Sequence, residues 1–241
     1  PVQQRQMTSS GAANVHALAI EGNFDDALRI VRELGETGRV EVVNSINPVR
    51  IEGQKTAAFE VVDQLGQAPD FHFLPVGNAG NITAYWRGYN EYRDAGLAGA
   101  GPRMFGFQAA NAAPLVEGRP IENPQTVATA IRIGNPASWD GAMNALKESN
   151  GHIAKVTDEE ILAAYKLVAR TEGVFAEPAS AASLAGLIHC VRDGLIPGGS
   201  KIVATLTGHG LKDPDNAISV AGLEPTIVAP ETDAVKRVIG L

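Results

Sequence analysis

The sequence predicts an α/β fold in which a parallel sheet carries helices on both faces. Short apolar runs alternate along the 241 residues with segments of helical periodicity, and this β-α-β-α order is typical of parallel strands joined by right-handed crossovers. The composition agrees, because 44% of the residues are hydrophobic and only 5% are aromatic, and the abundant Ala and Gly let helices lie close to a sheet. The length allows one large domain or one and a half ordinary domains.

Strands are predicted where short apolar runs end in polar or glycine residues. They are expected at residues 16–20, 40–44, 71–76, 104–107 and 202–206.

Helices are predicted between these strands, at residues 24–31, 51–65, 82–89, 157–173 and from about residue 180. Between residues 82 and 89 apolar side chains recur at i, i+3, i+4 and i+7, so Tyr85, Trp86 and Tyr89 are expected in the core. Thr157 and Glu160 form a capping box at the start of the fourth helix. A domain boundary is expected within the helical segment around residues 52–68.

Composition and charge exclude several classes of function. The net charge is −7 and no long basic patch occurs, which argues against a nucleic-acid partner. No apolar run approaches the roughly 18 residues of a membrane span, and no signal peptide is visible, so a cytoplasmic protein is expected. The single cysteine, Cys190, lies in an apolar stretch and is expected to be a buried thiol. The histidines show no metal-ligand spacing, and no metal site is predicted.

The strongest local signal is a glycine-rich turn at residues 75–81, between a predicted strand and a predicted helix. The first N–H groups of a helix lack internal partners and the helix dipole is positive there, so such a turn can hold a phosphate. A turn that binds nothing fits the pattern about equally well, but loops at this end of open parallel sheets commonly bind ligands. The motifs G-x-x-x-x-G-K-[ST] and G-x-G-x-x-G are absent, which argues against a nucleoside triphosphatase or a dinucleotide site. The predicted phosphate site consists of Gly77, Asn78, Ala79, Gly80 and Asn81.

A second polar cluster follows the predicted strand at 40–44. It comprises residues 44–50 and includes Asn44, Ser45 and Arg50. The planar guanidinium suits a phosphate or a carboxylate, and each hydrogen bond to such a charged group contributes about 1.5–3 kcal/mol. A polar turn that caps the following helix explains the spacing slightly better, so both interpretations stay open at this point.

The third cluster follows the last predicted strand. Thr207 could bond a ring nitrogen in a cleft at the top of the sheet, although threonine is common in strands, and His209 lies between glycines and is expected in an exposed turn. Ser180 is expected to cap a helix, and Glu177 could face the cleft. The loop at residues 134–139 could line a pocket or lie on the surface.

These segments together resemble the threonine synthases, a family of fold-type-II enzymes that use pyridoxal phosphate (PLP). The matching segments run in family order and cover most of the chain. They are NSINPVRIEGQKTAAFE (44–60), LPVGNAGNITAYWRGY (74–89), ATAIRIGNPASW (128–139), EEILAAYKLVARTEGVFAEPASAAS (159–183) and TLTGHGLKDPD (205–215). The match over residues 1–23 is looser.

The resemblance implies a tryptophan synthase β-like fold and a reaction, in which O-phosphohomoserine and water give L-threonine and phosphate. It implies that residues 77–81 hold the cofactor phosphate and that the Thr207 hydroxyl meets the pyridine nitrogen. It further implies a substrate phosphate site formed by Asn44, Ser45, Arg50 and Asn78, and a homodimer. Residues 1–68 would be the remainder of a smaller domain, and residues 69–241 part of a larger one that binds the PLP phosphate.

One family feature is not found in the sequence. The S-F-K-D-R-G segment with the Schiff-base lysine and the S-T-G-N loop that follows it do not occur, and neither Lys55 nor Lys212 has the context of that lysine. The chain, which opens at Pro1 without Met, is therefore expected to be an N-terminally truncated portion that forms no threonine alone. The alternatives are another fold-type-II enzyme, such as a threonine dehydratase or cysteine synthase, or a non-catalytic module that binds PLP or phosphate.

Overall fold

The computed structural model describes residues 15–22, 24–44, 47–221 and 226–241. Four parallel strands form one sheet with the order β3-β2-β1-β4. They are β1 (Phe71–Pro75), β2 (Arg103–Ala109), β3 (His152–Val156) and β4 (Ile202–Ala204). In the middle of β1, Phe73 pairs with Phe105 of β2 on one side and with Ala204 of β4 on the other.

Helices precede, connect and follow the strands. The α-helices are α2 (Phe24–Glu36), α3 (Pro48–Gln54), α4 (Thr56–Leu65), α5 (Gly80–Asp94), α6 (Pro114–Glu117), α7 (Trp139–Glu148), α8 (Asp158–Glu172), α9 (Pro178–Arg192), α10 (Pro214–Ala221) and α11 (Thr232–Ile239), and the short 3-10 helices are η1 (Thr129–Ile131) and η2 (Gly210–Lys212).

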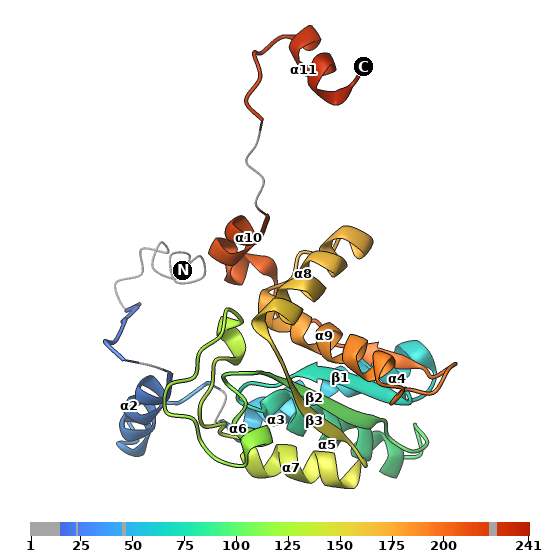
Figure 1. The fold of residues 1–241 in the computed structure, drawn as a ribbon. Helices are drawn as coiled ribbons and strands as arrows, with labels where there is room; N and C mark the ends of the chain where they lie inside the picture. Colours follow the sequence, from blue (N-terminus) through green and yellow to red (C-terminus); the bar gives the residue numbers. More distant parts are fainter. Residues whose placement is uncertain (1–14, 23, 45–46, 222–225) are drawn as a thin grey trace.

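The sheet separates two apolar cores, because successive side chains of a strand point to opposite faces. Phe73, Phe105 and Phe107 pack with α8 and α9, whereas Leu74 and Met104 pack with α4, α5 and α7. Figure 1 shows this arrangement, with α8 and α9 on one side of the sheet and α5 and α7 on the other. The predicted α/β fold with helices on both faces is therefore confirmed.

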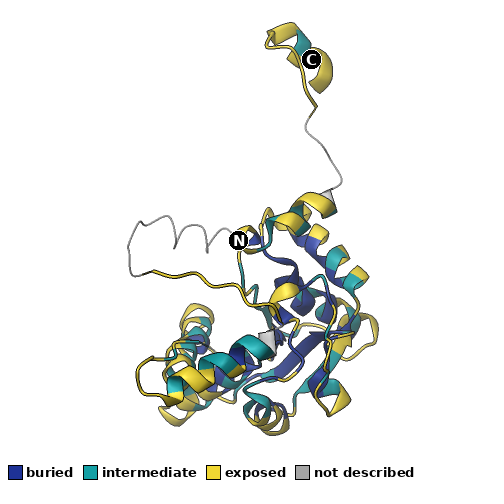
Figure 2. Cartoon of the chain, turned by 90° about the vertical axis from the view of Figure 1, so that its left-hand side faces the viewer, coloured by how far each residue is buried: buried dark blue, intermediate teal, exposed yellow. Residues whose placement is uncertain are grey.

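Most predicted elements are confirmed, including the strands at β1, β2 and β4 and the capping box of α8. The strands expected at 16–20 and 40–44 are wrong, since neither range is a strand in the structure. Both segments contain apolar side chains that are exposed to solvent: Leu18 is 86% exposed and Val43 is 80% exposed. Figure 2 shows the first segment in the yellow of exposed residues. Among the described residues neither segment pairs with a strand, and an apolar run alone cannot satisfy the backbone hydrogen bonds of a strand.

The sequence missed β3 and α7, and it merged α3 and α4 into a single helix. β3 is an edge strand in which only Val156 is buried, so its sequence lacks a continuous apolar run. α3 and α4 are separated at Lys55. Their separation leaves α3 as a short element of its own beside the start of α5.

The expected buried residues are found in the core. Tyr85, Trp86 and Tyr89 are buried, and so is Cys190. Burial raises the pKa of the Cys190 thiol to about 11, with a smaller contribution from Asp193, which keeps the thiol protonated and unreactive at neutral pH. Among the described residues no helix has the length and apolar character of a membrane span.

Candidate active site

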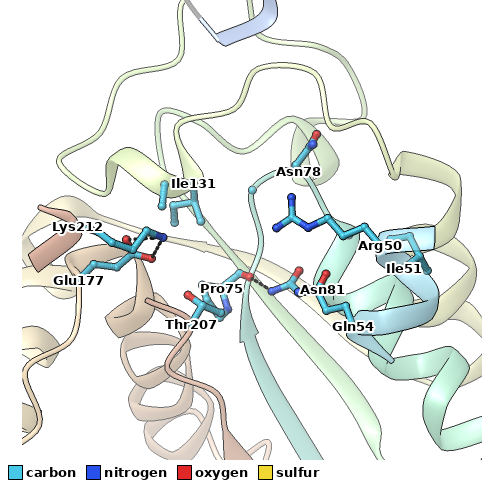
Figure 3. A pocket seen from close by; sticks show the side chains of 13 residues that line it. Arg50, Ile51, Gln54, Pro75, Asn78, Asn81, Ile131, Glu177, Thr207 and Lys212 are labelled. Atoms are coloured by element: carbon cyan, nitrogen blue, oxygen red, sulfur yellow. Dashed lines mark hydrogen bonds and ion pairs between the residues drawn. The ribbon is translucent and has the colours of Figure 1, made fainter. Parts of the chain in front are cut away.

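A cavity of about 210 Å³ lies at the carboxyl end of β1, where loops from several elements meet. Figure 3 shows that side chains from Arg50 to Lys212 in the sequence surround it. It is lined by Arg50, Ile51, Gln54, Pro75, Gly77, Asn78, Gly80, Asn81, Ala130, Ile131, Glu177, Thr207 and Lys212. Arg50, Thr207 and four of the five residues predicted for the phosphate site thus line the same cavity, although these segments are far apart in sequence; the fifth, Ala79, does not line it.

The turn after β1 has the backbone shape that an anion site requires. Ala79 adopts a left-handed conformation (φ 63°) and precedes α5, and no side chain caps this helix start. Glycine is the one residue type that fits at position 77, because a Cβ there would lie 2.9 Å from the Cα of Ile131. Gly80 is less restricted, because the nearest atom to an added Cβ, Cδ1 of Ile51, would be 3.5 Å away. The cap residue therefore covers none of the first N–H groups of α5, and among them only the N–H of Ile82 is bound by a side chain of the described residues, that of Asn81.

Asn81 and Asn78 brace this turn through their side chains. Asn81 donates from Nδ2 to the carbonyl of Pro75 (2.7 Å), and its Oδ1 accepts from the N–H of Ile82 (2.9 Å). Asn78 accepts from the N–H of Ala137 at Oδ1 (2.6 Å), which ties the 134–139 loop to the turn. Asn78 Nδ2 is buried and lacks a hydrogen-bond partner within the described part of the chain.

Arg50 reaches the cavity from α3. Asn47 caps this helix by accepting from the N–H of Val49 (2.9 Å), so the predicted capping role of the 44–50 cluster is confirmed alongside the position of Arg50 at the cavity. In Figure 3 the Arg50 side chain extends toward Asn78. Asn44 does not line the cavity, and Ser45 lies outside the described residues.

Lys55, which the sequence analysis rejected as a Schiff-base lysine, does not line this cavity. Its ammonium group forms ion pairs with Glu52 (2.8 Å) and Glu91 (2.6 Å). The hydrogen bonds to Glu52 and Glu91 raise the pKa of Lys55. A lysine held in its charged form is a poor nucleophile, which agrees with the rejection.

Three segments meet on the opposite side of the cavity. Thr207 follows β4 and lies 3.2 Å from the hydroxyl of Ser180 in α9. Glu177 is 3% exposed, and its carboxylate pairs with the Lys212 ammonium of η2 (3.1 Å). Gly208 lies against this carboxylate, because an added Cβ would be 2.1 Å from Oε1 of Glu177. Figure 3 shows the pair beside Thr207.

The prediction that Ser180 caps a helix is wrong. The residue at the cap position of α9 is Glu177, and Pro178 begins the helix, so Ser180 lies inside the first turn. Its hydroxyl instead accepts from the N–H of Gly208 (2.9 Å). The expectation for His209 is confirmed, because it is exposed in the turn and its Nδ1 accepts from the N–H of Leu211 (3.1 Å).

The comparison with known proteins decides the family. The sequence pattern of the pyridoxal-phosphate dependent enzymes matches residues 1–208. The chain belongs to this family. The threonine synthase of Mycobacterium tuberculosis (strain ATCC 25618 / H37Rv) is 58% identical over 226 residues, which cover 93% of this chain and 62% of that protein. The chain thus spans about three fifths of the length of this curated relative.

Solved structures in this family share the fold. The PLP-bound threonine synthase from Brucella melitensis is 28% identical, has a TM-score of 0.67, and is matched over 94% of this chain and 56% of that chain. The processed form of threonine deaminase isoform 2 from Solanum lycopersicum is 21% identical, with a TM-score of 0.70 over 92% of this chain and 61% of that chain. The second similarity supports the fold alone.

The cavity residues fit the cofactor that gives the family its name. The uncapped start of α5 and the unpartnered Asn78 amide nitrogen are donors suited to a phosphate, and the Thr207 hydroxyl is suited to a ring nitrogen. None of the described residues forms a cluster of three or more His, Cys, Asp or Glu that could hold a metal ion.

Sequence reasoning did not place several residues at the cavity: Ile51, Gln54, Ala130, Ile131 and Lys212. Lys212 was considered in the sequence analysis only as a possible Schiff-base lysine. Lys212 lies at the cavity because it pairs with Glu177, the residue that was expected to face the cleft. Ala130 and Ile131 belong to η1, which has no periodic pattern. Their closeness to Gly77 explains the glycine there, but sequence alone does not indicate that contact.

Proposed function

We propose that a protein containing this chain is a PLP-dependent threonine synthase, a carbon–oxygen lyase that converts O-phosphohomoserine and water to L-threonine and phosphate. The observation that carries the proposal is the single cavity shared by the glycine-rich turn, Thr207 and Arg50. The high identity to threonine synthases over most of the chain supports the same reaction.

Each side of the cavity has a distinct task in this proposal. Backbone N–H groups of residues 77–81 bind the cofactor phosphate, and Thr207 contacts the opposite end of the ring. When bound, PLP supplies an electron sink for the reacting carbons. The Thr207 hydroxyl is neutral, so it leaves the ring nitrogen unprotonated and moderates that sink.

Arg50 holds the phosphate of the substrate in this proposal, together with Asn78. A guanidinium binds phosphate through paired hydrogen bonds in a fixed geometry, and α3 carries Arg50 beside the turn that binds the cofactor. Asn44 and Ser45 are proposed as the remaining residues of the substrate site; they precede Asn47, the residue that caps α3, and Asn44 lies outside the lining of the cavity. The arrangement brings an anionic substrate next to the cofactor, and Arg50 is the donor that the substrate phosphate does not share with the cofactor phosphate.

The test uses a lysine-bearing enzyme, meaning a protein that contains these 241 residues together with a segment that carries the family's Schiff-base lysine. We expect Arg50→Ala to lower kcat/KM for O-phosphohomoserine by about 100-fold or more, because two charge-assisted hydrogen bonds are lost. Phosphate release measures the reaction, and the PLP content of the variant should not change.

Arg87→Ala is the matched control, since Arg87 lies on the neighbouring α5, pairs with Glu52 and does not line the cavity. An unaffected rate in Arg50→Ala would favour a threonine dehydratase or a cysteine synthase type of enzyme. A protein that takes up PLP but transforms none of these substrates would favour a non-catalytic binding module.

We further propose that the lysine-bearing enzyme is a cytoplasmic homodimer without a nucleic-acid partner. Residues 1–68 would belong to its smaller domain, and residues 69–241 to the larger domain that binds the PLP phosphate. Light scattering during size-exclusion chromatography tests the dimer, and a mass equal to one chain would contradict it.

A further inference from the structure

We infer that Ser180 is a positioning residue that directs the hydroxyl hydrogen of Thr207 into the cavity. The inference rests on the proposed function, because the acceptor in question is the unprotonated ring nitrogen of PLP. It goes beyond that function by adding a second hydroxyl, one that would act on the cofactor only through Thr207.

Ser180 is fully buried and makes three polar contacts with the loop after β4. Its Oγ accepts from the N–H of Gly208 (2.9 Å) and lies 3.2 Å from Oγ1 of Thr207 and 3.3 Å from the carbonyl oxygen of Gly208. One side chain on a core helix therefore holds both the backbone and the side chain of the Thr207–Gly208 segment.

The direction of the hydrogen bond between Ser180 and Thr207 is part of the inference, because either hydroxyl can be its donor. A serine hydroxyl carries one hydrogen, and two acceptors lie within its reach. The Gly208 carbonyl already accepts from the N–H of Glu177 (2.9 Å), whereas the Thr207 oxygen is the nearer of the two acceptors. Donation from Ser180 to Thr207 leaves the hydrogen of Thr207 for the cavity.

This direction matches the acceptor that the cofactor would present. An unprotonated pyridine nitrogen has a lone pair and no hydrogen, so Thr207 must donate to it. The chain of bonds then runs from Ser180 to Thr207 to the ring nitrogen, and each bond polarises the next in the same sense. Because Ser180 lies on α9, which packs against the sheet, the donor is held in place before the cofactor binds.

Ser183 offers a matched control on the same helix. It is also fully buried, but its hydroxyl lies near backbone carbonyl oxygens only, at 2.8 Å from that of Ser180 and 3.2 Å from that of Thr205, among the contacts of the described residues. Removing it deletes a buried hydroxyl of equal size without removing the contact with Thr207.

The experiment reconstitutes the lysine-bearing enzyme with PLP labelled with ¹⁵N at the ring nitrogen. The measured quantities are the Kd for PLP and the ¹⁵N chemical shift of the bound ring, in Ser180→Ala, Ser183→Ala and Thr207→Val. We expect Ser180→Ala to weaken PLP binding by about 5- to 10-fold, the effect of one lost hydrogen bond. It should also move the ¹⁵N resonance in the same direction as Thr207→Val, whereas Ser183→Ala should leave the resonance at its original position.

The outcomes distinguish the ring site of the proposed function from the role of Ser180. If the unmodified enzyme takes up no PLP, or if Thr207→Val leaves the resonance unchanged, the ring site of the proposed function is wrong. If Thr207→Val moves the resonance and Ser180→Ala does not, only the role of Ser180 is overturned. Ser180→Cys keeps the shape with a weak donor, and the same resonance decides the question if Ser180→Ala does not fold.

Discussion

The two sides of the cavity are built in different ways. The turn side is one continuous stretch, residues 75–81, whose shape depends on backbone conformation and on close contact with η1. The Thr207 side is assembled from α9, η2 and the loop after β4, and side-chain contacts hold it together. The comparison suggests that the phosphate end of the site is rigid, whereas the ring end can adjust through side-chain movement.

The strongest test of this difference is Gly77→Ala. The added Cβ would lie 2.9 Å from the Cα of Ile131 and 3.0 Å from the carbonyl oxygen of Ala130, and both are backbone atoms that cannot rotate away. We expect a loss of about 3 kcal/mol in the free energy of unfolding, at the upper end of overpacking costs, together with lost PLP uptake. Urea unfolding measures the first quantity and absorbance titration the second.

Gly99→Ala is the control for this change, because an added Cβ at Gly99 meets no atom within 4 Å. If Gly77→Ala and Gly99→Ala unfold at the same urea concentration, the turn side is not limited by its backbone and the comparison fails.

The same difference explains what the sequence could predict. The turn was predicted because all of its residues lie within one short motif, and the chemistry of a helix start is local. Thr207 was identified mainly through the resemblance to threonine synthases, since a threonine after a strand is a weak signal. The role of Ser180 was missed because its partner, Gly208, lies 28 residues away.

The fold was predicted best where burial is continuous. β1 is buried along its whole length and its sequence is mostly apolar, whereas β3 has one buried residue and was missed. The wrong strands at 16–20 and 40–44 show the reverse error, because apolar sequence there is not matched by a pairing partner in the described chain. Which segments pair as strands therefore had to come from the structure.

His72 contacts a residue from each of the two sides of the cavity and provides the second test. This fully buried residue of β1 lies 2.8 Å from the hydroxyl of Tyr89, in the helix that begins at the turn, and 2.7 Å from the hydroxyl of Thr205, two residues before Thr207. Burial lowers the pKa of His72 from 6.5 to about 3. Burial raises the pKa of Tyr89, so that hydroxyl stays protonated throughout the acid range.

The sign of the pH effect follows from these values. Between pH 6.5 and pH 3 the unfolded chain binds a proton at His72 that the folded chain does not, so stability is full above about pH 6.5 and falls as the pH is lowered. We expect a loss of about 1.4 kcal/mol per pH unit, or roughly 2 kcal/mol by pH 5. Urea unfolding as a function of pH measures this slope.

His72→Gln is the control for this effect, since it cannot titrate. His152 contributes in the same direction, because burial and the nearby Arg103 lower its pKa as well. The slope that belongs to His72 is therefore the difference between the unmodified protein and His72→Gln. Equal slopes in both proteins would show that His72 is not held in its neutral form.

The smallest expected effect belongs to Gly208→Ala, on the adjustable side. The added Cβ would meet the carboxylate of Glu177 at 2.1 Å, closer than any contact at Gly77, yet the obstructing atoms are the end of a side chain. Glu177 lines the cavity, so its carboxylate can turn into that space at the cost of its pairing with Lys212, and we expect a loss of about 1 kcal/mol in unfolding free energy, at the lower end of overpacking costs. PLP binding should weaken because Thr207 moves with Gly208. A stability loss as large as that of Gly77→Ala would mean that the buried Glu177 carboxylate fixes the ring side as firmly as the backbone fixes the turn.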